Sequence, residues 1–157
     1  MNHEALLSIA ARIRQHPDKF THFTSGEETV MPSLHEKTPM VPMSVAEWAV
    51  MLFGDGDVVE ERRVRSSIAV RHKVHGPTKI LSEVLIGYAT ELLLLDGVED
   101  IVLYFGMWPM SWWDPNTPFD VDRYFDIEDT EIALAVPTAD EAATALERMA
   151  NHAANWF

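Results

Sequence analysis

The residues of this chain best suited to chemistry are six carboxylates between positions 120 and 131. Calcium loops of the EF type use oxygen ligands at a similar spacing, with glycine at the sixth position and a carboxylate at the twelfth. Counted from Asp120, the twelfth residue is Glu131, but the sixth is Phe125 and the fifth is Tyr124. Phenylalanine resists the sharp turn that glycine allows, and the fifth position should supply an oxygen ligand. We therefore expect a solvated acidic face rather than a calcium site, formed by Asp120, Asp122, Asp126, Glu128, Asp129 and Glu131.

Histidine is the other residue type that could hold a metal. His72 and His75 lie three positions apart in a segment that alternates like a strand, so their side chains would fall on opposite faces. His16 and His22 flank Pro17 with no further candidate ligands nearby in sequence. The chain also has no cysteine, no glycine-rich phosphate loop, no G-x-S-x-G and no H-E-x-x-H. We therefore expect no cofactor, no metal site and no enzyme activity.

The net charge of −13 is concentrated in the carboxyl half of the chain. Residues 1–74 carry ten acidic and nine basic side chains, whereas residues 75–157 carry fifteen acidic and three basic ones. Such a field repels nucleic acid and attracts basic surfaces. The charge predicts a basic protein partner and no nucleic-acid partner. The alternative is that the acidity only keeps the protein soluble.

The segment GMWPMSWWDPNTPF, residues 106–119, holds three of the five tryptophans. We expect Trp108 to pack in the core. Trp112 and Trp113 are adjacent, and adjacent side chains of an extended segment point to opposite sides, so we expect one of them at the surface or in an interface. Exposed tryptophan bordered by acids is typical of protein-binding patches. The predicted partner-binding residues are Trp112, Trp113, Asp114, Asp120, Asp122 and Tyr124.

Apolar spacing and capping residues predict the helices that must position these side chains. Helices are expected at 3–15, 44–53, 80–95, 98–105 and from 138 to near Trp156, and a loop is expected at 21–43. Asn2 can cap the first helix, and Ser44 with Glu47 forms a capping box at the second. Thr138 with Glu141 repeats that box at the last helix. Residues 80–95 have the widest apolar face and should form the central helix.

Two short segments alternate with a period of two and predict strands. They cover residues 64–74 and 131–136, and we expect them to pair. Together with the helices they predict a mainly α fold: one compact helical domain over residues 1–157 with a small two-stranded β element. No apolar run is long enough to span a membrane, and the first residues lack the features of a secretion signal. We therefore expect a cytoplasmic protein with no membrane partner.

The stretch ATELLLLDGVEDIVLYFGMWPMSWW resembles a pattern in small helical proteins of unknown function from actinobacteria and their phages. In that family a helix ending A-x-E-L-L-G-L is followed by an acidic turn, a short helix ending L-F, and then W-P. Here Ala89 and Glu91 match the helix end, and Trp108 with Pro109 matches W-P. The segments IRQHPDKF and SVAEWAVMLFGDGD are similar to the opening of the family, which usually carries cysteines and an A-G-W-A helix that this chain lacks. The resemblance implies a compact helical fold and no particular activity.

These observations favour a non-enzymatic acidic interaction protein, in keeping with a phage-encoded protein that binds and modulates a host protein. The target could be a basic, nucleic-acid-binding protein engaged by mimicry, or a replication sliding clamp. One alternative is a homodimer with a structural or regulatory role, in which the strand at 64–74 pairs with its own copy. Another is a small enzyme or ligand-binding domain with a pocket lined by Trp113, Tyr124 and the acids of 120–131.

Overall fold

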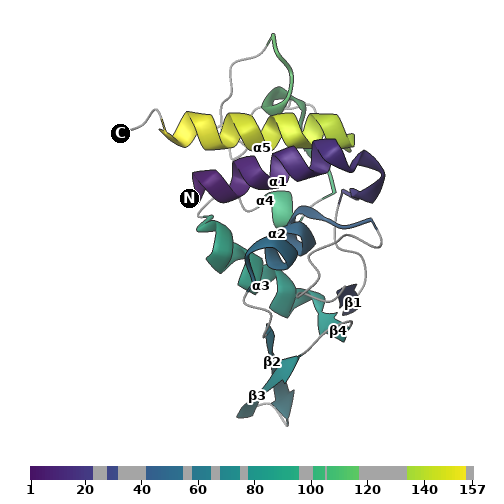
Figure 1. The fold of residues 1–157 in the computed structure, drawn as a ribbon, viewed down its shortest axis with the longest axis vertical. Helices are drawn as coiled ribbons and strands as arrows, with labels where there is room; N and C mark the ends of the chain where they lie inside the picture. Colours follow the sequence, from purple (N-terminus) through teal and green to yellow (C-terminus); the bar gives the residue numbers. More distant parts are fainter. Residues whose placement is uncertain are drawn as a thin grey trace.

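The computed structural model describes residues 1–22, 28–31, 42–54, 58–64, 68–74, 78–95, 101–104, 106–116 and 134–154. Within these ranges the chain is mainly helical, as the sequence predicts, and it has three short antiparallel strand pairs where the sequence predicts one. Helices α1 and α5 lie side by side at one end of the molecule, helices α2 and α3 lie in the middle, and the β2–β3 hairpin lies at the other end (Figure 1). No helix among the described residues is long and apolar enough to cross a lipid bilayer.

Helices α1 (His3–Gln15) and α5 (Ala139–Ala154) run antiparallel to each other. Each turns one apolar stripe inward, and alanine is frequent in both stripes. Small side chains let two helix axes approach closely, since the interaxial distance depends on the side chains at the contact. The buried residues of the pair are Ala5, Leu6, Ile9, Ala10 and Ile13 from α1, and Ala142, Ala143, Ala145, Leu146, Met149 and Ala150 from α5.

Asn2 connects the beginning of α1 to the end of α3 (Ser82–Leu93). Its side-chain oxygen accepts a hydrogen bond from the Ala5 amide at 3.1 Å, which confirms the predicted cap. Its backbone amide donates to the Leu93 carbonyl at 2.7 Å, and its side-chain amide donates to the Leu92 carbonyl at 3.3 Å. Asn2 thus bonds an amide at the start of α1 and carbonyls at the end of α3, which are backbone groups without partners inside their own helices.

Helix α2 (Val45–Phe53) is almost entirely buried, and its capping box forms as predicted. The Ser44 hydroxyl accepts from the Glu47 amide at 3.4 Å, and the Ser44 amide donates to the Glu47 carboxylate at 3.5 Å. The Trp48 indole donates to the Lys19 carbonyl at 3.1 Å. The helix ends at Gly54, where an added Cβ would lie 2.4 Å from the Val50 carbonyl oxygen, so only glycine fits.

The central helix is shorter than predicted. Residues 78–81 form strand β4 (Thr78–Leu81), so the expected start of the helix at residue 80 is wrong. Helix α3 ends at Leu93, and Leu94 follows with a φ of 51°. This left-handed conformation ends many helices and is usually occupied by glycine. The short helix α4 (Ile101–Tyr104) lies within the predicted range 98–105.

The three strand pairs correct two predictions. Strand β1 (Glu28–Met31) pairs with β4, so part of the expected loop 21–43 is a strand. Strand β3 (Ile68–Val74) pairs with β2 (Val58–Val64), not with residues 131–136, and Val64 belongs to the preceding strand. Strand β6 (Leu134–Ala135) pairs instead with β5 (Trp108–Pro109). The β2–β3 hairpin closes a far shorter loop than the predicted pairing of residues 64–74 with 131–136, so closing it costs less conformational entropy.

Candidate functional site

The tryptophans of residues 106–116 belong to the core, and their segment contacts α5. Trp108 is fully buried, as predicted, and Trp112 is also fully buried. Trp113 is 8% exposed, so the prediction that one of these adjacent indoles lies at the surface is wrong. The physical reason is local: residues Met110–Trp112 form a 3-10 turn rather than an extended segment, so adjacent side chains need not point to opposite sides.

Arg148 on α5 fixes this segment to the helical body. Its guanidinium donates to the carbonyl oxygens of Ser111 at 2.9 Å and Asp114 at 2.7 Å. The Asp114 carboxylate in turn accepts from the Asn116 amide at 3.0 Å. The charged hydrogen bonds from Arg148 keep this backbone ordered. An ordered segment loses little conformational entropy when a partner binds to it.

The outer side of the same segment is apolar and exposed. Four of the six exposed large apolar side chains among the described residues belong to β5, β6 and their flanks. The exposed fractions are 48% for Met107, 42% for Met110, 40% for Leu134 and 52% for Val136. We call these four residues the β5–β6 surface. Single exposed apolar residues are ordinary, but a gathering of them marks an interaction site.

The register of the ribbon explains why these residues share a face. Trp108 stands opposite Ala135, and Pro109 stands opposite Leu134. Continued by one residue, the register sets Met107 opposite Val136. Because side chains alternate between the two faces of a strand, Trp108 and Ala135 take the core side while Met107, Leu134 and Val136 take the other. Trp108 is fully buried and Ala135 packs against the core, as this division requires, whereas Pro109 is buried although the alternation places it on the other face.

Acidic residues surround the β5–β6 surface in the sequence. The connection between its strands, residues 117–133, carries six acidic side chains and one basic one. The predicted partner-binding residues Asp120, Asp122 and Tyr124 fall in this connection and lie outside the described residues. Asp114, at its start, is half-buried. Of the predicted set, the structure therefore brings together Trp112, Trp113 and Asp114.

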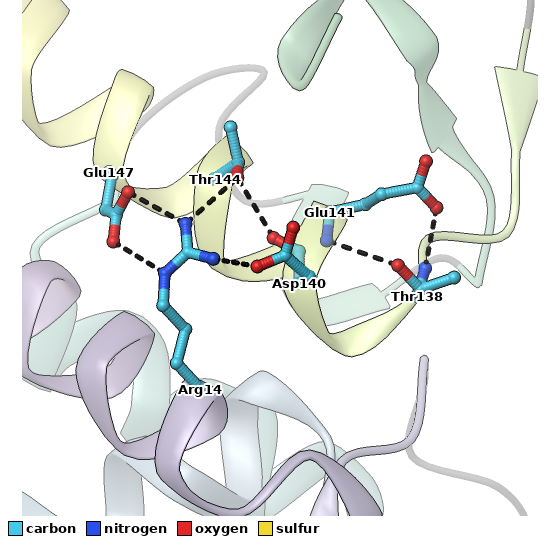
Figure 2. A network of polar contacts seen from close by, with 6 residues as sticks. All are labelled: Arg14, Thr138, Asp140, Glu141, Thr144 and Glu147. Atoms are coloured by element: carbon cyan, nitrogen blue, oxygen red, sulfur yellow. Dashed lines mark hydrogen bonds and ion pairs between the residues drawn. The ribbon is translucent and has the colours of Figure 1, made fainter.

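A second polar constellation joins α1 to α5 on the outside of the helix pair (Figure 2). Arg14 donates from Nε and Nη2 to the two Glu147 carboxylate oxygens, at 3.1 Å and 3.0 Å. It also donates to the Thr144 hydroxyl at 3.0 Å and forms an ion pair with Asp140. The hydrogen bonds that Arg14 donates to Glu147, followed by the charges of both carboxylates, raise the pKa of Arg14 above its ordinary value. With every guanidinium nitrogen engaged by α5, this cluster holds two helices together.

The histidines have no shared ligand geometry in the part of the chain that is described. No group of three or more histidine or carboxylate side chains there is placed to hold a metal ion. The His3 ring nitrogen Nδ1 lies 2.9 Å from the Ala150 carbonyl oxygen and links the start of α1 to α5. His75 lies outside the described residues. The acidic segment 120–131 does too, so the expectation that it forms no calcium site stays a prediction.

Sequence reasoning missed all four residues of the β5–β6 surface. The signal was available in Met107–Met110 and 133–136, where apolar residues occupy both faces of the alternation. The local pattern alone does not distinguish either stretch from a buried strand. Only the pairing of the two segments shows which of their residues face solvent. Comparison of the chain with family models, curated proteins and solved structures gave no match. The resemblance to the small actinobacterial and phage proteins therefore stays a prediction.

Proposed function

We propose that this chain is a non-enzymatic interaction protein whose β5–β6 surface binds a basic, amphipathic segment of a partner protein. The observation that carries the proposal is the gathering of Met107, Leu134 and Val136 on the solvent side of one ribbon, with exposed Met110 in the turn that follows β5. The opposite side of that ribbon is anchored by fully buried Trp108. The surface is therefore apolar and also rigidly backed.

The energetics of such a surface favour binding. Each of these side chains is about half exposed, so covering it contributes roughly 1 kcal/mol, half the value for full burial. Methionine adapts its shape to different apolar partners and is frequent on binding surfaces. The ordered ribbon also lowers the entropic cost of association, because little of the chain has to become ordered on contact.

Charge selects the chemistry of the partner. The surface is bounded in sequence by a connection with six acids and one base, in a half of the chain that carries fifteen acids against three bases. Opposite potentials steer encounter and fix specificity more than they add affinity. A partner segment that combines lysine or arginine with leucine, methionine or phenylalanine matches both the apolar surface and the acidic residues that adjoin it in the sequence.

A selection from random displayed peptides tests this proposal, because it samples many candidate partner segments at once. We expect the peptides that bind the immobilised protein to combine basic and large apolar residues, and to lose affinity at high salt. The double variant Met107→Ser, Val136→Thr should weaken their binding by about tenfold, from the loss of two half-buried contacts. Both substitutions are at exposed positions, so the circular dichroism spectrum should not change.

The matched control alters two exposed apolar residues elsewhere. Leu7 on α1 and Leu94 after α3 are 39% and 61% exposed. The variant Leu7→Gln, Leu94→Asn keeps helix propensity at the first position and the left-handed conformation at the second. It should bind the selected peptides like the unaltered protein. Selection of neutral or acidic peptides, or equal weakening by the control variant, contradicts the proposal.

A further inference from the structure

The β2–β3 hairpin differs in charge from the rest of the molecule. Residues 58–74 carry five basic side chains and two acidic ones, although the rest of the chain has seven basic and twenty-three acidic. The hairpin lies at the end of the molecule away from α1 and α5 (Figure 1). A two-stranded ribbon alone is marginally stable in water and gains stability from a further strand or a packed face.

The observed register divides the hairpin into two unlike faces. Val58 stands opposite Val74, Arg62 opposite Val70 and Val64 opposite Ile68, so the even-numbered positions of both strands share a face. Five of the eight residues on that face are valine or isoleucine. The odd-numbered face is mostly charged, and there Glu61 stands opposite Arg71.

One edge of β2 is paired with β3, and its other edge pairs with no strand among the described residues. We propose that this edge pairs antiparallel with β2 of a second copy of the chain, about a two-fold axis at Glu61. A two-fold axis perpendicular to a sheet keeps equivalent residues on the same face. Directly opposed residues also share a face, so even positions oppose even ones and odd oppose odd. The axis must therefore pass through a residue rather than between two residues. Strands of seven residues give an edge long enough for such a pairing.

The charges of β2 select the register centred on Glu61. In that register Glu60 stands opposite Arg62 of the second copy, and Val58 stands opposite its Val64, each pair occurring twice. Opposite charges and apolar residues directly across from each other stabilise a sheet. The two Glu61 residues meet at the axis, where each already stands opposite Arg71 of its own hairpin. Across the four strands this row reads Arg71, Glu61, Glu61 and Arg71, so its net charge is zero.

Neighbouring registers and the other edge are less complementary. Centred on Glu60, the pairing sets Val58 opposite Arg62 and brings no opposite charges together. Centred on Arg62, it also brings Glu61 opposite Arg63 twice, but it sets Glu60 opposite Val64, places the two Arg62 residues together and forms no valine–valine pair. The edge of β3, centred on Arg71, pairs valine with histidine and alanine with lysine. In the Glu61 register the joined sheet has four strands. On its apolar face, two symmetric rows across the four strands consist only of Val74, Val58, Val64 and Ile68.

Sedimentation velocity of the full chain over a wide range of concentrations tests this pairing. We expect a reversible dimer. Glu60→Arg, or Arg62→Glu, places like charges opposite each other twice in the dimer and should weaken association by about tenfold or more. The double variant Glu60→Arg, Arg62→Glu restores opposite charges in the same register and should restore the dimer. Only a direct pairing of these two positions predicts that rescue.

Glu4→Arg on α1 is the matched control, because it changes the net charge as Glu60→Arg does but lies at an exposed position of the helical body. It should leave association unchanged. A monomer at every concentration overturns the pairing, as does a dimer insensitive to both single variants or a double variant that stays monomeric. Binding of a short duplex DNA by a monomeric wild-type chain, lost in Arg62→Glu, would assign the basic hairpin to nucleic acid instead and would equally overturn it.

Discussion

The α1–α5 pair and the β5–β6 ribbon cover the same core but differ on their outer sides. Both turn apolar residues inward, with Ile9 and Leu146 in the helices and Trp108 in the ribbon. On the outside, the helix pair is joined by the charged cluster of Arg14 and Glu147. The ribbon has the β5–β6 surface there instead. The inner sides follow from packing alone, whereas the outer side is charged in the helix pair and apolar in the ribbon.

The largest expected effect is the difference in folding stability between substitutions on the inner and the outer face of the β5–β6 ribbon. Trp108→Ala removes a fully buried side chain and should lower the free energy of unfolding by about 3–5 kcal/mol. Met107→Ala, one residue away but exposed, should change it by less than about 0.5 kcal/mol. Urea denaturation of both variants measures the difference. Similar losses would mean that the outer face also supports the fold, and would remove the contrast.

A second, smaller effect should distinguish the buried capping box from the exposed one. Ser44→Ala deprives buried Glu47 of a hydrogen bond at 3.1 Å and should cost about 1–2 kcal/mol. Thr138→Ala removes, at exposed positions, the hydrogen bond that the Glu141 amide donates to the Thr138 hydroxyl at 3.3 Å, and should cost about 0.5–1 kcal/mol. Thermal and urea unfolding rank the two variants. If Thr138→Ala proves the more costly, α5 depends on its cap more than on its packing.

The smallest effect concerns the charged outer side of the helix pair. Arg14→Gln should lower the free energy of unfolding by about 0.5–1 kcal/mol, because the cluster is partly exposed and screened by solvent. The difference from wild type should shrink as salt is added. Since the pKa of Arg14 is raised, its contribution is present at every pH below the ordinary pKa of arginine and is lost only as pH rises beyond it. A loss independent of salt would indicate packing by the arginine stem instead.

Local features of the fold could be predicted because they depend on neighbours in sequence. Both capping boxes, the Asn2 cap and the end of α2 at Gly54 involve residues within a turn of each other. The start of α3 could not, because residues 78–81 have apolar spacing that suits either a helix or a strand. They form a strand because β1 lies alongside to pair with them.

The sequence predicts the candidate site in position but not in orientation. The expectation for residues 106–119 combines a core tryptophan with a contact surface; the burial of Trp108 confirms the first, and the second stays a prediction. The exposed residues are Met107 and Met110 rather than Trp112 or Trp113, because the 3-10 turn carries both indoles inward. A turn of three residues is stabilised by the core beneath it, which no local pattern records.

The sequence by itself determined the helices, their caps, the tryptophan anchor and the asymmetric charge of this protein. These depend on propensity, spacing and composition, which act within a few residues or over the whole chain. Only the tertiary structure decided which strands pair, and therefore which side of each ribbon meets solvent. Strand pairing brings together residues distant in sequence, and a choice between partners rests on loop entropy and burial that become defined only when the core assembles.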